Sequence, residues 1–372
     1  MNFIIKKELF LENLNNVSKA ISSKNIIPIL GGIKLDLNNE GLFLTCSDNE
    51  ITIRSFIDKK YIEKINEKGS IVILGRYFIE LIRKIPSETI EIVADGLNLT
   101  INTLNGEYNL NGMNPEEFPD KTLELVETPI KIDKTIIKNI INQTSFAISK
   151  QESRPILTGI NFKIKDNKME CVATDSYRLA KKIIELEEKI KEEINIVVPG
   201  NNLIELSKII NDEDEKVELH IFSNNILFKF DNILFQSRLL NGNYPDTSKL
   251  IKEDSLVNII VNTENLYNSI DRASLLTSEK DKNVIKMELK ENNLVISSNS
   301  QEIGKIEEKI NIEKTNDINI EISYSSKYMM EALRTIKGEE TLILLSGEIK
   351  PIILKSKEDD NLIQLIVPIK TF

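Results

Sequence analysis

One sequence pattern that occurs twice constrains the fold of this chain more than any other feature. The first copy is Tyr77–Ile85 and the second, 251 residues later, is Tyr328–Ile336. Both copies place apolar residues at helical spacing and a glutamate and an arginine on the opposite face, as in an amphipathic helix that packs on a core. A weaker copy, Asn202–Ile210, lies about midway between them. The repeat period is therefore the size of a whole domain.

The length of the chain agrees with three such domains. A chain of 372 residues exceeds the size at which one hydrophobic core stops growing, and a third of it matches the usual size of a domain. The acidic, glycine-free segments Thr122–Thr128 and Ile251–Ser255 lie between complete repeats. We therefore predict three domains, at residues 1–125, 126–253 and 254–372.

Each repeat begins with a short strand and a longer amphipathic helix. These helices are predicted at residues 8–21, 133–148 and 263–277, with Asp133 and Thr263 as N-caps. An apolar strand, a polar turn and a second strand follow each helix, which is typical of β-hairpins; the turns are at 38–41, 165–168 and 291–293. Each domain therefore has two helices packed on antiparallel sheets, and the predicted fold class is α+β.

Charges are unevenly distributed along the sequence. The chain has a formal net charge of −10, but the six predicted helical segments together carry +8 and the remaining residues −18. Two interpretations fit this segregation. Lys and Arg could simply favour helices, or the basic helix faces could form a surface that attracts a phosphate backbone. Charge alone leaves both open.

Single residues and motifs give no sign of catalysis. The sequence has no phosphate-binding loop, no nucleophile elbow and no cysteine pair at metal-binding spacing. Cys46 and Cys171 are in apolar strand-like runs, so we predict buried, reduced thiols. His220 is predicted to be an exposed strand residue, and Asp359–Asp360 a solvated turn. Without an apolar stretch of ~18 residues or a signal-peptide layout, the prediction is a cytoplasmic protein with no membrane contact and no cofactor.

Four further motifs follow the repeat in order. They are Pro28–Leu30 (Pro-Ile-Leu), Ala173–Ala180 (Ala-Thr-Asp-Ser-Tyr-Arg-Leu-Ala), Asn241–Asp246 (Asn-Gly-Asn-Tyr-Pro-Asp) and Leu365–Phe372 (Leu-Ile-Val-Pro-Ile-Lys-Thr-Phe). Together with the threefold repeat, they resemble the bacterial DNA polymerase III beta subunit family, the replicative sliding clamps, from end to end. The carboxyl-terminal motif is similar to that of Gram-positive members.

The resemblance implies the DNA clamp fold and a head-to-tail homodimer, in which two subunits of three domains close a ring around duplex DNA. Helices would line the hole and contact phosphates, so the ring would hold DNA without sequence preference and slide along it. The implied DNA-contact residues are Lys24, Arg76, Arg83, Lys138, Gln151, Arg154, Arg334 and Lys337. An ordinary solvated helix face is the alternative for each of them.

A second implied site is a hydrophobic peptide-binding cleft between the middle and third domains. The DNA polymerase III alpha subunit, the clamp loader, other polymerases and repair proteins would bind it through short apolar motifs. The implied cleft residues are Leu157, Thr174, Ser176, Tyr177, Arg178, Leu179, Pro245, Lys249, Leu250, Tyr328, Ser346, Val367, Pro368, Ile369 and Lys370. For Thr174–Leu179 the alternative is a plain turn with an internal Asp175 hydrogen bond.

The implied subunit interface pairs Tyr108 and Leu110 of one chain with Leu275 and Leu276 of the next, where edge strands would extend a sheet between subunits. Ordinary core packing is the alternative for these residues. By this resemblance the protein is a processivity factor that tethers the replicative polymerase and has no catalytic activity. A hydrolase whose carboxylates no motif reveals, and a scaffold that binds only protein, are the alternative functions.

Overall fold

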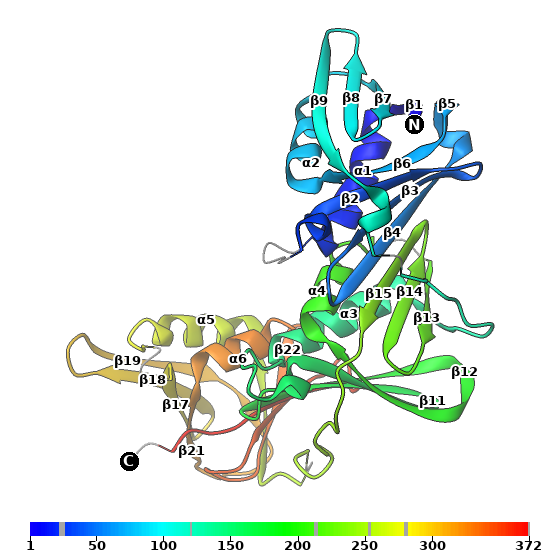
Figure 1. Cartoon of the computed structure of the whole chain (residues 1–372). Helices are drawn as coiled ribbons and strands as arrows, with labels where there is room; N and C mark the ends of the chain where they lie inside the picture. The colour runs from blue at the N-terminus through cyan, green and yellow to red at the C-terminus, as the bar shows by residue number, and fades with distance from the viewer. Residues whose placement is uncertain (22–26, 120, 212–214, 252–253, 279–281, 371–372) are drawn as a thin grey trace. The chain divides into compact units, whose positions relative to one another are not determined.

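The computed structural model describes residues 1–21, 27–119, 121–211, 215–251, 254–278 and 282–370. The chain forms two compact units (Figure 1). The first unit comprises Met1–Thr135 and Lys208–Leu239, and the second comprises Ile136–Ser207 and Leu240–Phe372. In both units helices pack on antiparallel sheets, which confirms the predicted α+β class.

Six α-helices in the described residues match the predicted repeat. They are α1 (Lys7–Val17), α2 (Gly75–Lys84), α3 (Lys134–Thr144), α4 (Gly200–Ser207), α5 (Thr263–Ser274) and α6 (Ser326–Leu333). The predicted cap Thr263 is wrong: Asn262 caps α5 by accepting a hydrogen bond from the N–H of Asn265, because the Thr263 hydroxyl bonds Thr341 instead. No helix in the described ranges is long and apolar enough to cross a membrane.

One antiparallel sheet of 13 strands forms the framework of the first unit. Its strands, in spatial order, are β10 (Ile130–Asp133), β13 (Lys216–Ile221), β14 (Asn225–Phe230), β15 (Ile233–Arg238), β4 (Ile51–Asp58), β3 (Gly41–Ser47), β2 (Gly32–Leu37), β6 (Gly69–Leu74), β9 (Gly106–Met113), β8 (Asn98–Thr103), β7 (Thr89–Asp95), β1 (Asn2–Lys6) and β5 (Ile62–Glu67). Strands of the first and second repeats therefore share one sheet.

The two repeats meet where β4 pairs with β15. Residues 51–55 of β4 are in antiparallel register with residues 233–237 of β15. Beside this pairing, the buried side chain of Asn13 on α1 accepts hydrogen bonds from Ser55 and Asn232. These bonds satisfy a side-chain amide that is buried although it lies outside the apolar stripe predicted for this helix.

Aromatic side chains pack the two helices of the first unit against its sheet. Phe3 on β1, Phe10 on α1 and Phe78 on α2 are fully buried. Their rings meet edge to face, with centroids 6.1 Å apart for Phe3 and Phe10 and 5.8 Å apart for Phe10 and Phe78. Such pairs contribute about 0.5–1.5 kcal/mol beyond their burial, so this triple fixes both helices on the strand that begins the chain.

Two antiparallel sheets form the second unit. The larger has the order β11 (Gly159–Thr174), β12 (Arg178–Pro199), β24 (Leu362–Ile366), β23 (Ile352–Ser356), β22 (Glu340–Leu345), β16 (Val257–Asn262) and β20 (Glu313–Lys314); the smaller has the order β19 (Gly304–Asn311), β18 (Asn293–Ser300), β17 (Val284–Lys290) and β21 (Glu321–Ser325). The register of β11 on β12 shifts around Asp166, which has a φ of 54°, and the predicted turn at 165–168 falls on this irregularity.

The cysteine prediction is confirmed and the histidine prediction is wrong. Cys46 and Cys171 are buried, free thiols. His220 is 2% exposed, because its Nδ1 accepts a hydrogen bond at 2.9 Å from the N–H of Val126, in the segment that leads into β10. A segment distant in sequence thus covers the outward face of β13. The alternation of apolar and polar residues along a strand cannot predict that another segment packs on its polar face.

Candidate functional site

A turn built around Asp175 connects β11 to β12. Its carboxylate accepts hydrogen bonds from the N–H groups of Tyr177 at 2.9 Å and Arg178 at 3.0 Å. The Thr174 hydroxyl donates to the Arg178 carbonyl at 2.6 Å and accepts from the N–H of Ser176, which has a φ of 78°. The internal Asp175 turn is therefore present. It holds the side chains of Ser176 and Tyr177 in solvent.

Arg178 is a buried cation at the base of this turn. Its guanidinium bonds the carboxylates of Asp175 and Glu331. The same group lies over the ring of Tyr328, 4.4 Å from the centroid, and 5.2 Å from that of Phe146. Burial and then the nearby Asp175 carboxylate raise the pKa of Tyr328. Because a buried charge is stable only when it is paired, these contacts fix the turn to α6.

A small apolar cluster lies on the sheet face beside the turn. Alternate residues of β22, β23 and β24 belong to the main core, and those between them point to this other face. The cluster consists of Val172, Leu179, Leu344, Ile353, Ile363 and Leu365. Tyr244, Ile251 and Leu342 pack against it and are only partly buried. An apolar surface of this kind suits apolar side chains of a short peptide.

The segment before β16 packs Tyr244 and Ile251 against the cluster, and three predicted residues lie between these two in the sequence. The Tyr244 hydroxyl accepts a hydrogen bond at 3.0 Å from the N–H of Thr174, and burial raises the pKa of Tyr244. Pro245 and Lys249 are exposed, and Leu250 is 50% exposed. An exposed leucine next to an apolar cluster is available to a partner.

The end of the chain is tied to the same turn. Val367 donates its N–H to the Tyr177 carbonyl at 2.8 Å, and Ile369 donates its N–H to the Ser323 carbonyl at 2.7 Å. Pro368 is half-buried between them, and the predicted residue Lys370 is exposed. The last two residues, 371–372, lie outside the described residues. Of the remaining predicted cleft residues, Leu157 is buried and the Ser346 hydroxyl donates to a backbone carbonyl.

Of the six cluster residues, sequence reasoning named only Leu179 and missed Val172, Leu344, Ile353, Ile363 and Leu365. It also missed the role of Glu331. Helical spacing puts Glu331 on the wetted face of α6, whereas its carboxylate bonds the distant Arg178. A usable signal existed for the cluster. Residues 362–366 are apolar at four of five positions, which is typical of a strand that is buried on both faces.

The predicted DNA-contact residues that the structure describes lie on helices, after α6 and in the loop that follows α3. Lys24 lies outside the described residues. Arg76 and Arg83 are exposed on α2 of the first unit. In the second unit, Lys138 on α3 is half-buried. Gln151 and Arg154 in the loop after α3 are exposed, and so are Arg334 and Lys337 after α6.

Some of these cations make local contacts. Arg83 pairs with Glu80 on the same helix. The Arg334 guanidinium donates to the Tyr267 hydroxyl and lies 5.4 Å from the centroid of its ring. Lys337 donates to an asparagine side chain at 3.1 Å. Exposed pairs of this kind stabilise by only about 0–1 kcal/mol, so the cations can exchange these partners for phosphate oxygens.

β9 carries two of the predicted interface residues along a partly open edge. β8 pairs with β9 from Gly106 to Asn111, whereas β6 pairs only with Gly112 and Met113 on the other side. Tyr108 and Leu110 are half-buried on the open stretch. Backbone groups along this edge are available to another strand.

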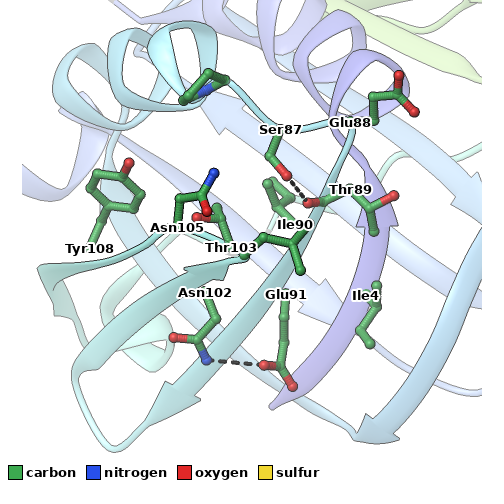
Figure 2. Close-up of a pocket in the computed structure, with 12 residues that line it drawn as sticks. Ile4, Ser87, Glu88, Thr89, Ile90, Glu91, Asn102, Thr103, Asn105 and Tyr108 are labelled. Atoms are coloured by element: carbon green, nitrogen blue, oxygen red, sulfur yellow. Dashed lines mark hydrogen bonds between the residues drawn. The ribbon is translucent and has the colours of Figure 1, made fainter.

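A surface pocket of about 600 Å³ lies beside Tyr108 in the first unit. Figure 2 shows Tyr108 at one side of the pocket, facing residues of β7 and β8. The Asn102 side chain donates to Glu91 at 3.0 Å along the wall. Leu104, which also lines the pocket, is 97% exposed. The pocket therefore offers both polar and apolar contacts next to the open edge.

The other predicted interface residues lie near the edge of the smaller sheet of the second unit. β19 is the outermost strand of that sheet. Arg272 on α5 makes two hydrogen bonds of 2.6 Å with Glu308 on β19, which fixes the helix to the strand. Leu275, directly after the helix, is 74% exposed and Leu276 is half-buried. Leu275 is therefore not a core residue.

In the part of the chain that the structure describes, the acidic side chains do not gather into a metal site. Within that part, no group of three or more His, Cys, Asp or Glu side chains is placed to hold a metal ion. Asp359, predicted in a solvated turn, bonds the amine of Lys182, and its carboxylate also accepts the N–H of Asn361 at 3.2 Å. Its partners thus give Asp359 a structural role.

Comparisons with known proteins agree over the full length of the chain. Family models match residues 1–123, 131–246 and 248–370 as the N-terminal, central and C-terminal domains of the DNA polymerase III beta subunit. The chain is 42% identical to the beta sliding clamp of Bacillus subtilis and 41% identical to that of Staphylococcus epidermidis, with all of each chain covered. The crystal structure of the DNA polymerase sliding clamp from Bacillus subtilis superposes with a TM-score of 0.96, again over 100% of both chains.

Proposed function

This chain belongs to the DNA polymerase III beta subunit family, and we propose on that premise how its surfaces act. As a beta sliding clamp it is a processivity factor, an accessory subunit of the polymerase without catalysis of its own. Two chains, each with domains at 1–125, 126–253 and 254–372, close head to tail into a ring around duplex DNA in the cytoplasm. The full-length match to known clamps is the observation that carries this proposal.

The proposed DNA contacts are electrostatic and weak. The cations at 24, 76, 83, 138, 154, 334 and 337, with Gln151, meet phosphate oxygens and no base edges, so the ring binds DNA without sequence preference. Retention comes from the closed ring. Because no single contact must be strong, the ring can slide.

The proposed peptide-binding surface is the apolar cluster with the turn and the carboxyl-terminal segment. Leu179 and its neighbours receive apolar side chains of a partner peptide, while Ser176, Tyr177 and Lys370 are exposed at the edge. The DNA polymerase III alpha subunit, the clamp loader, other polymerases and repair proteins use it in turn. The buried Arg178 pairs support this function because they hold the turn in one conformation.

The proposed subunit interface is a shared sheet. The open edge of β9 pairs with β19 of the partner subunit, and Tyr108 and Leu110 pack on the two leucines that follow its α5. The exposure of Leu275 supports this interface. The rotation that relates the subunits must close for a ring to form.

A DNA-retention assay tests the ring. The clamp, loaded by its clamp loader onto nicked circular plasmid, should remain with the circle during gel filtration and leave when a restriction enzyme linearises the DNA. An ordinary DNA-binding protein would respond equally to both forms. Equal retention on circle and linear DNA contradicts the ring.

Sedimentation of an interface variant tests the subunit contact. Leu275→Ser with Leu276→Ser should weaken dimerisation by about 10³-fold, since central apolar residues each contribute about 2 kcal/mol. Ile349→Ser, which also removes an exposed apolar side chain of the second unit, is the control and should remain dimeric. A dimeric double variant contradicts the interface.

Deletion of residues 367–372 tests the peptide surface separately. The truncated chain should lose affinity for a polymerase peptide while it still forms dimers. Unchanged peptide affinity argues against this surface but leaves the ring intact.

A further inference from the structure

The first unit has a charged pocket on the face of β2, β3 and β4, the strands drawn in blue in Figure 1. Its volume is about 360 Å³. Lys34, Arg54 and Lys121 bring three cations to its lining, whereas Asp36 is the one carboxylate in it. This pocket contains none of the predicted DNA-contact, peptide-binding or interface residues.

The register of the three strands arranges the lining in two rows. Lys34 pairs with Thr45, which pairs with Arg54, so that two cations flank a hydroxyl group. In the next row, Asp36 pairs with Phe43, whose ring packs on that of Phe56, outside the lining, with centroids 4.6 Å apart. The pocket therefore offers a cationic row directly next to the aromatic ring of Phe43.

No ion pair joins Lys34 or Lys121 of this pocket to another described residue. The side chains of Lys34 and Asp36 form no hydrogen bond or ion pair with any of the other described residues. The Lys121 amine donates to the backbone carbonyl of Asp48 at 3.1 Å. Burial is the main cause that lowers the pKa of Lys121, and Arg238 adds to it, while two nearby carboxylates oppose the shift. An added negative charge would stabilise this pocket.

The pocket has the same place in the repeat as the proposed peptide-binding surface. Asp48 accepts two backbone N–H groups at 2.7 Å each, from the residues two and three positions on, as Asp175 does 127 residues later. Phe118–Pro119 likewise precedes Tyr244–Pro245 by 126 residues, and Phe118 and Tyr244 each pack on the outer face of their sheet. The first and second repeats therefore contain the same turn, and in each an aromatic side chain covers the outer face of the sheet.

We propose that this pocket is a second docking site, which binds a short acidic peptide segment of a partner protein. The carboxylates of the segment pair with Lys34, Arg54 and Lys121, and an apolar side chain between them rests on Phe43. DNA fits less well, because the exposed part of the Phe43 ring offers a duplex no apolar partner. The proposal does not depend on peptide binding in the second unit.

Fluorescence anisotropy with the full-length protein tests this site. The probe is a fluorescein-labelled peptide, Glu-Glu-Phe-Glu-Glu-Leu, and its glutamine analogue is the uncharged control. The acidic peptide should bind, and its affinity should fall with added salt as screening increases. Lys34→Gln with Lys121→Gln should weaken binding by at least tenfold. Lys163→Gln with Lys165→Gln, which removes two lysines from β11, should change it less than twofold.

Three outcomes would overturn the proposal. The first is equal affinity in both double variants, and the second is equal affinity for the glutamine analogue. The third is loss of affinity for a 20-base-pair duplex, with peptide affinity unchanged, in the Lys34 and Lys121 variant, which would assign the pocket to nucleic acid. Circular dichroism melting of each variant confirms that it is folded before binding is measured.

Discussion

The two places where successive repeats share a sheet have the same strand geometry and opposite chemistry. In the first unit β4 pairs with β15, and Thr52 is opposite Gln236. In the second unit β12 pairs with β24, and the corresponding pair is Leu179 and Leu365. One outer face is polar and lies next to a cationic pocket, whereas the other is an apolar cluster.

The difference shows that the side chains on the outer face can change while the backbone pairing of the two strands stays the same. The hydrogen bonds of the ladders join main-chain groups, so they tolerate threonine and leucine equally. The Thr52 hydroxyl bonds Ser47 at 2.7 Å, whereas Leu179 packs in the cluster. A repeat can therefore keep its fold and recruit different partners at each junction.

The largest effect should come from giving the second junction the side chains of the first. Leu179→Thr with Leu365→Gln should lower the free energy of unfolding by about 4 kcal/mol, since it removes buried apolar groups and buries an amide. Urea denaturation with an unchanged m-value measures this. Gln236→Leu in the half-buried counterpart is the control, with a change within about 0.5 kcal/mol. A loss below about 1 kcal/mol in the double variant would mean that the cluster is not packed.

The next largest loss of stability should come from removing the charge of Arg178, which follows the turn at the second junction. Arg178 corresponds to Ile51 in the first unit, which carries no charge and is buried. Arg178→Met should cost about 3 kcal/mol in unfolding free energy, because the Asp175 and Glu331 carboxylates lose their partner. Adding Glu331→Gln should recover part of that loss. An additive loss in the double variant would show that the two side chains do not interact.

A smaller effect should follow from removing the hydrogen bond between the Ser47 and Thr52 hydroxyls at the first junction. Thr52→Val keeps the side-chain shape but takes a partner from the Ser47 hydroxyl, and should cost about 1 kcal/mol. A thermal or urea denaturation series with Ser47→Ala and the double variant forms a mutant cycle. Zero coupling energy would show that this hydrogen bond contributes nothing to the junction.

The smallest effect should depend on pH and occur only in the first unit. There, the neutral imidazole of His220 accepts a hydrogen bond from the N–H of Val126 before β10. In the second unit, the N–H of Leu256 before β16 bonds the Leu345 carbonyl, which does not titrate. Burial lowers the pKa of His220; Glu218 opposes this shift and Lys229 adds to it.

Because the folded pKa of His220 lies below the unfolded value of about 6.5, the unfolded chain binds more protons below that pH. The contribution of His220 to the free energy of unfolding should therefore decrease as pH falls below about 6.5 and be constant above that pH. His220→Gln should reduce the slope of urea midpoints between pH 7.5 and 5.5. Parallel pH profiles of the two proteins would exclude His220 as the cause.

Periodicity predicted the helices well and buried polar residues poorly. The stripes of α1, α3 and α5 follow from apolar spacing within each segment. The burial of Asn13 and His220 does not, because their partners are Asn232 and Val126, which are distant in sequence. The Glu331 partner of Arg178 is missed for the same reason. A local pattern shows that a side chain can be buried but not what satisfies it.

The sequence by itself determined the threefold repeat, the α+β class and the family, because periodicity and short motifs are local properties of the chain. Tertiary structure alone decided that β4 lies beside β15 and β12 beside β24, where the paired residues are more than 170 positions apart in the sequence. Backbone hydrogen bonds make those pairings, and they carry no side-chain signature. Which outer residues gather into an apolar cluster or a cationic pocket is a consequence of those pairings.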